Sequence, residues 1–145
     1  MTDSTATATM SMEEVRDRVL DAALLHVPFD GWSEPTLRAA IREADVPEGL
    51  ARAAFPRGAV DLALAFHERG DIAMVRRLRA ADLSHLRFRD KIAAAVRYRI
   101  EAAEDREAVR RGTALFALPQ HSADGARAIW GTADRIWETL GDASD

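Results

Sequence analysis

The stretch that decides the fold comprises residues 33–66, SEPTLRAAIREADVPEGLARAAFPRGAVDLALAF. Ser33 is a suitable N-cap for one helix, and the turn-forming residues 45–49 separate it from a second, shorter helix that ends near Pro56. Gly58 then begins a long helix that we expect to extend to about Ala80. Two short helices joined by a tight turn have the layout of a helix-turn-helix unit.

The remaining sequence has the same helical periodicity, because apolar residues recur every three or four positions and no alternating β-branched run appears. A first helix should begin after Ser11, and further helices are expected at about 86–104, 105–118 and 123–140. The sequence therefore predicts an all-α protein. We expect a disordered tail at 1–10, a helix-turn-helix-like unit at 11–80 that includes the long helix, and a partial helical region for ligand binding or dimerisation at 81–145.

The composition of the chain argues against several classes of protein and of binding site. The length of 145 residues suits one domain, and 20 Lys+Arg against 24 Asp+Glu give a formal net charge of -4. Nucleic-acid binders usually carry a basic surplus, so this balance argues against DNA or RNA as a partner. The absence of cysteine removes disulfides and thiolate metal sites. No apolar run is long enough for a membrane span, and the first ten residues lack the features of a secretory signal.

The sequence contains few residues or motifs that indicate catalysis. None of the four histidines, at positions 26, 67, 85 and 121, pairs with another at metal-ligand spacing, and no phosphate-binding or nucleophile motif occurs. His67 and Asp71 lie one helical turn apart and could form a hydrogen bond. A structural role is the favoured interpretation of this histidine. We therefore expect neither an enzyme nor a cofactor.

The second helix of the helix-turn-helix is poorly suited to reading DNA. Arg52 is its one candidate for a base or phosphate contact, whereas Glu48 would repel the backbone. Residues 33–56 contain three arginines against four acids, which makes the unit formally acidic.

The last helix has the most regular apolar stripe. Trp130 and Trp137 are seven residues apart and therefore share one face. Core or dimer-interface packing is the favoured interpretation, and a ligand-lining role is the alternative.

Several motifs carry a family resemblance. Residues 39–66 resemble the N-terminal domain of tetracycline-repressor-like (TetR) regulators. A second set of motifs extends along the chain from about Arg16 onward: His26-Val27-Pro28-Phe29-Asp30-Gly31-Trp32-Ser33, Phe55-Pro56 with Gly58 and Asp61-Leu62, Asp71 with Met74, Ala108-Val109-Arg110-Arg111, Ala117-Leu118-Pro119, and Thr132-Ala133-Asp134-Arg135-Ile136-Trp137 followed by Gly141-Asp142. In these motifs the chain resembles the coenzyme Q (ubiquinone) biosynthesis accessory family.

The resemblance implies a non-enzymatic lipid-binding protein with a TetR-like fold. It implies that an apolar pocket takes isoprenoid quinone or phospholipid and that the protein presents quinone intermediates to the di-iron hydroxylase of the pathway. The candidate lipid-binding residues are Met74, Leu78, Ile92, Val96, Ile100, Leu115, Phe116, Ile129 and Trp130. The candidate docking residues for the hydroxylase are Asp134, Ile136, Trp137, Gly141 and Asp142.

The chain departs from the family at its end, because family members continue into further helices, the last of them an amphipathic membrane-binding helix. We therefore expect the protein to lie in the bacterial cytoplasm, peripheral to the inner membrane, or in the mitochondrial matrix of a eukaryote. We also expect its contact with the membrane to be weakened. We also expect a homodimer that covers Ile129, Trp130, Ile136 and Trp137. The alternatives are a TetR-like regulator that binds DNA and a helical interaction module without a small ligand.

Overall fold

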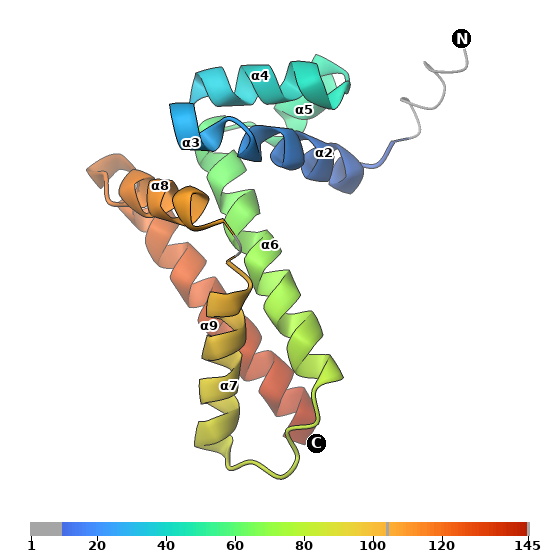
Figure 1. The fold of residues 1–145 in the computed structure, drawn as a ribbon, viewed down its shortest axis with the longest axis vertical. Helices are drawn as coiled ribbons and strands as arrows, with labels where there is room; N and C mark the ends of the chain where they lie inside the picture. The colour runs from blue at the N-terminus through green and yellow to red at the C-terminus, as the bar shows by residue number, and fades with distance from the viewer. Residues whose placement is uncertain (1–9, 104, 145) are drawn as a thin grey trace. The chain divides into compact units, whose positions relative to one another are not determined.

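The computed structural model describes residues 10–103 and 105–144, except for the side chains of residues 142–144, and all regular structure within them is helical (Figure 1). This confirms the all-α prediction. The elements are α2 (Met12–Leu24), α3 (Val27–Asp30), α4 (Glu34–Ala44), α5 (Glu48–Ala54), α6 (Ala59–Ala80), α7 (Phe88–Glu101), α8 (Arg106–Phe116), the 3-10 turn η1 (Pro119–His121) and α9 (Ser122–Ser144).

The chain forms two compact units. Unit 1 contains the chain up to Phe66 together with Glu107–Leu115, and unit 2 contains His67–Arg106 and the chain from Phe116 onward. The expected boundary at residue 80 differs from this division, which falls within α6 and returns α8 to unit 1. The tail expected at 1–10 lies, apart from Met10, outside the described residues.

Unit 1 is built on α2, which packs against α4 and α5. Both predicted N-caps are present: Ser11 Oγ accepts a hydrogen bond from Glu14 N at 3.1 Å, and Ser33 Oγ accepts one from Thr36 N at 3.4 Å. The core consists of apolar side chains that are fully or almost fully buried, among them Val15, Val19, Leu37, Ile41, Phe55 and Leu62.

The break between α2 and α4 contains the short helix α3, which the sequence did not predict. Gly31 ends it with φ +67°, a left-handed conformation that favours glycine, and its carbonyl oxygen accepts from Thr36 Oγ1 at 2.7 Å. Trp32 follows and is buried; its Nε1 donates to Ala108 O at 3.0 Å, and its ring lies 5.4 Å from that of Phe66. This long-range hydrogen bond explains why α8 belongs to unit 1.

Unit 2 is a small helical bundle made from the second half of α6 with α7 and α9 (Figure 1). Met74 and Leu78 from α6 pack with Ala95 and Tyr98 from α7 and with Leu140 from α9. Met74 is fully buried and Leu140 is 2% exposed, so the side chains of the bundle fill its centre.

Candidate functional site

Several large apolar side chains of α7 and α9 in unit 2 are exposed to solvent. Ile129 is 69% exposed, Trp130 70%, Ile100 68% and Trp137 59%. Together with Val96, which is also exposed, these residues are called the α7–α9 apolar surface below. Single exposed apolar residues are ordinary on proteins, whereas several on two packed helices are a candidate for an interaction surface.

Helical spacing produces this surface. Val96 and Ile100 are four residues apart on α7, and Trp130 and Trp137 are seven apart on α9, so each pair projects from one face of its helix. The two helices pack against each other, and the rings of Phe88 and Trp137 lie 5.3 Å apart. Leu140 on α9 packs in the core of unit 2, whereas Trp130 and Trp137 on the same helix are exposed. Helix α9 therefore carries more large apolar side chains than the core buries.

A buried polar network links α6, α7 and α9 of unit 2. Asp71 on α6 is 3% exposed, and its Oδ1 accepts from Arg99 Nε and from Thr132 Oγ1, both at 2.7 Å. Arg135 Nε lies 3.9 Å from Asp71 Oδ2. Asp71, Thr132 and Arg135 all belong to motifs that carry the family resemblance, so two motifs distant in sequence meet at one carboxylate.

His67 also belongs to this network, and its ring contacts lie within unit 2. Its Nε2 lies 2.8 Å from Thr132 Oγ1 and 3.1 Å from Ala128 O, while its Nδ1 lies 3.3 Å from Arg99 Nη2. An Nε2–H donor and an Nδ1 acceptor satisfy these contacts, which is the neutral tautomer. Burial lowers the pKa of His67, which also favours the neutral ring.

Gly70 makes room for Arg99. A Cβ atom at Gly70 would lie 2.4 Å from Arg99 Nη1 and 2.6 Å from Arg99 Cζ. The guanidinium therefore lies directly on the backbone of α6, where its Nη2 also donates to His67 O at 3.0 Å. Arg99 was not predicted, because charged residues on α7 give no periodic signal. The glycine at position 70, within a helix, is a signal that could have suggested a close approach.

The structure distributes the nine candidate lipid-binding residues over several environments. Met74 and Leu78 lie in the filled core of unit 2, and Ile92 packs partly against it. Val96, Ile100, Ile129 and Trp130 lie on the α7–α9 apolar surface. Leu115 belongs to unit 1 and Phe116 to unit 2, and both are half-buried.

The candidate docking residues all lie on α9. Asp134 and Gly141 are exposed, and Trp137 is part of the apolar surface. Ile136 packs partly against the core, and the side chain of Asp142 lies outside the described residues. The structure thus brings Trp137 and Trp130 onto one surface and leaves Ile136 largely to the bundle.

Arg52 on α5, the one base-contact candidate of the helix-turn-helix, is engaged within unit 1. Its Nη2 lies 2.7 Å from Glu34 Oε1, and its Nε lies 4.0 Å from Glu48 Oε1. Two carboxylates therefore surround the cation on which DNA contact would depend.

Across residues 10–103 and 105–144, no three His, Asp or Glu side chains are grouped so as to hold a metal ion. Along the same residues, no helix has both the length and the apolar character that crossing a bilayer requires.

Comparison with known proteins adds no relative: no protein-family model matches the chain, and no curated protein does.

Proposed function

We propose that this protein is a non-enzymatic lipid-binding protein whose α7–α9 apolar surface takes an isoprenoid quinone or another hydrophobic ligand. The exposure of Ile129 and Trp130 carries the proposal. Burial of one large apolar side chain is worth about 1.5–3 kcal/mol, so these two residues offer a ligand several kcal/mol of favourable contact. The filled centre of unit 2 supports a ligand seated against the helices rather than enclosed by them.

The finer function that we propose follows the resemblance to the ubiquinone accessory family. The protein would present quinone intermediates to the di-iron hydroxylase of the pathway, with Asp134 and Trp137 at the docking surface and a second copy of the chain covering part of α9. A TetR-like fold and peripheral membrane contact belong to the same proposal. What supports it is the meeting of the family motifs at Asp71 and the solvent-facing tryptophans.

Regulation through DNA is the alternative, and the pairing of Arg52 with Glu34 disfavours it. Specific DNA binding needs cations free to meet phosphates and bases. A salt-dependent gel shift with wild-type protein and an Arg52→Ala variant would favour this alternative if the wild type shifted DNA and the variant did not.

Quinone quenching of tryptophan fluorescence tests the lipid-binding proposal. A ubiquinone with a two-isoprene tail is titrated into the wild-type protein and into an Ile129→Ser variant. We expect saturable quenching of the wild type and about 5–30-fold weaker binding to Ile129→Ser, since roughly 1–2 kcal/mol of apolar contact is removed. Substitution of an exposed side chain changes stability by only about 0.5 kcal/mol, so the variant should remain folded.

Leu25→Ser is the matched control, because Leu25 is 70% exposed but lies on unit 1. This variant should bind the quinone as the wild type does. Equal weakening in both variants, or quenching that never saturates, would contradict the assignment of the ligand to α7 and α9.

A further inference from the structure

A concave site lies in unit 2, where the α6–α7 loop meets the end of α9. It is a pocket of about 410 Å³, within the size range of small-molecule sites. Its lining residues come from the end of α6, the loop, α7 and α9; they are Leu78, Arg79, Ala81, Asp82, Leu83, Ser84, Lys91, Thr139 and Leu140. Of these residues, Leu78 alone is among the lipid-binding candidates that the family resemblance implies.

The apolar part of the pocket belongs to the core. Leu78 is 5% exposed and Leu140 is 2% exposed, and Leu83 packs against the same cluster. Leu78 and Leu140 are held by the surrounding helices and form the base of the pocket, while the half-buried Ala81 and Leu83 supply more of the apolar surface that a ligand could contact. A short hydrocarbon chain placed there would exchange water for a fixed apolar surface.

Two cations, Arg79 and Lys91, line the same pocket. Within the described part of the chain, neither Arg79 nor Lys91 lies within 4.0 Å of a carboxylate oxygen, although other arginines of α6 and α7 are paired. Arg77, for comparison, pairs with Glu101 and stacks on Tyr98 with its Cζ 3.9 Å from the ring centre.

The pocket's own carboxylate is already engaged. Asp82 Oδ1 accepts from Ser84 Oγ at 2.6 Å and from Ser84 N at 3.2 Å. These bonds lower the pKa of Asp82 and hold its charge at the loop. Among the described residues that line the pocket, two cations therefore stand against one acid that already has partners, which makes this described lining net positive.

We propose that this pocket binds a single-chain amphiphilic anion, with its carboxylate at Arg79 and Lys91 and its hydrocarbon against Leu78, Leu83 and Leu140. Neither feature suffices alone: an exposed cation pair holds a simple anion weakly, and the wall is too small to hold a chain without a charged anchor. The proposal stands apart from the α7–α9 apolar surface, because no residue of that surface lines the pocket.

Calorimetric titration of the full chain with decanoate, decanol and acetate tests this assignment. Decanoate should bind, whereas decanol lacks the charge and acetate lacks the chain, so each should bind at least about tenfold more weakly. Lys91→Met and Arg79→Met keep the aliphatic stem and remove the charge, and each should weaken decanoate about tenfold.

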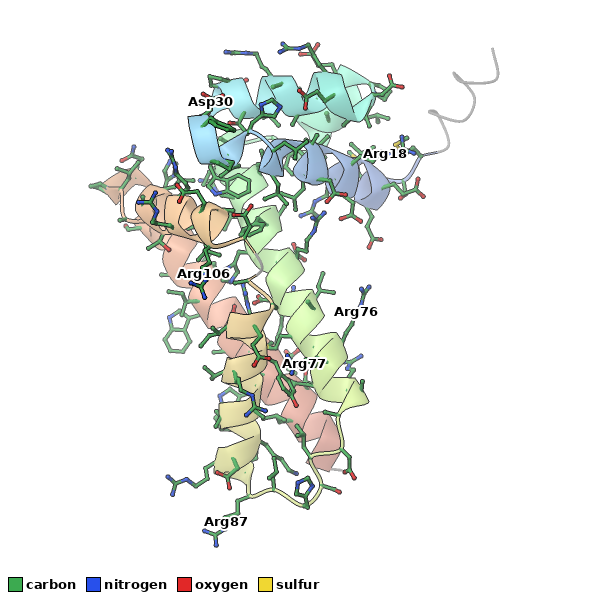
Figure 2. The ribbon with its side chains drawn as sticks, viewed as in Figure 1. Arg18, Asp30, Arg76, Arg77, Arg87 and Arg106 are labelled. Atoms are coloured by element: carbon green, nitrogen blue, oxygen red, sulfur yellow. The ribbon has the colours of Figure 1, made fainter. Side chains whose placement is uncertain are left out.

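Arg76→Met is the matched control for charge loss on the same helix. Arg76 is exposed and projects away from α6 into open space (Figure 2), and it does not line the pocket. This variant should bind decanoate as the wild type does. Equal affinity for decanoate and decanol, or unchanged decanoate binding by both Lys91→Met and Arg79→Met, would overturn the proposal.

Chemical labelling gives a second readout, because Lys91 is the one lysine in the sequence. Acetylation by acetic anhydride, followed by intact mass and peptide analysis, then reports on two amines, Lys91 and the N-terminus. Decanoate should slow acetylation of Lys91 severalfold and leave the N-terminal amine unchanged. Decanoate binding that Ile129→Ser abolishes while Lys91 stays unprotected would place the ligand on the α7–α9 apolar surface; that result would refute the pocket and leave the proposed function intact.

Discussion

The close approach of Arg99 to Gly70 makes a prediction about the sign of a stability change. In most helix interiors, replacement of Gly by Ala stabilises the fold by about 0.8–1.0 kcal/mol. At Gly70 the new Cβ would lie 2.4 Å from Arg99 Nη1, so the guanidinium must move. Movement of a flexible side chain is cheap in itself, but this one donates to Asp71 at 2.7 Å and to His67 O at 3.0 Å.

The loss of the Arg99 contacts opposes the gain in helix propensity at Gly70. Loss of a hydrogen bond to a charged group costs about 1.5–3 kcal/mol, and a buried carboxylate left without its partner costs about 3–5 kcal/mol. Asp71 keeps Thr132 as a second donor and Arg135 at 3.9 Å, which limits the loss. We therefore expect Gly70→Ala to lower the free energy of unfolding by about 1–3 kcal/mol after its gain in helix propensity.

A double-mutant cycle isolates the cause. Urea unfolding followed by circular dichroism is measured for Gly70→Ala, Arg99→Ala and the double variant. In the Arg99→Ala background, Gly70→Ala should become stabilising by about 1 kcal/mol, because the obstructing side chain is gone. Gly131→Ala in α9, where a Cβ meets no atom within 4 Å, is the matched control and should be stabilising in both backgrounds. A Gly70→Ala effect of the same sign with and without Arg99 would refute the reasoning.

Three further predictions concern local features. The pKa of His67 is lowered from 6.5, so the unfolded chain binds the proton first. Stability should therefore fall as the pH drops below about 6.5, and His67→Gln should flatten that dependence of urea unfolding; an unchanged slope would contradict the burial of the neutral ring. Trp32→Phe removes the donor to Ala108 O and should cost about 1–2 kcal/mol in urea unfolding, whereas an undiminished midpoint would show that α8 does not depend on this bond. Ser11→Ala should cost about 1 kcal/mol through the loss of the α2 cap, and unchanged thermal unfolding would exclude that role.

Local signals predicted most of the helices. Ser11 and Ser33 serve as N-caps as expected, since a cap depends on residues within one turn. The boundaries shifted by a few residues: α7 begins at Phe88 rather than near residue 86, and α9 continues to Ser144 rather than stopping at about 140. Such shifts are typical where the ends of helices lack strong caps.

Sequence patterns could not predict which residues distant in the chain contact each other. The hydrogen bond from Trp32 to Ala108 assigns α8 to unit 1, yet the two residues are 76 positions apart. The buried ion pair of Arg99 with Asp71 was equally hidden, because periodicity shows where apolar residues lie and not which arginine turns inward. Trp130 shows the same limit, since its stripe was compatible with a core residue and the structure places it 70% in solvent.

Native mass spectrometry of protein purified without detergent tests the central claim most directly. The wild-type chain should carry a co-purified hydrophobic ligand of isoprenoid mass, and Ile129→Ser should lose most of it while Leu25→Ser keeps it. A wild-type protein that is ligand-free, or ligand retained equally by Ile129→Ser, would contradict a lipid site on α7 and α9.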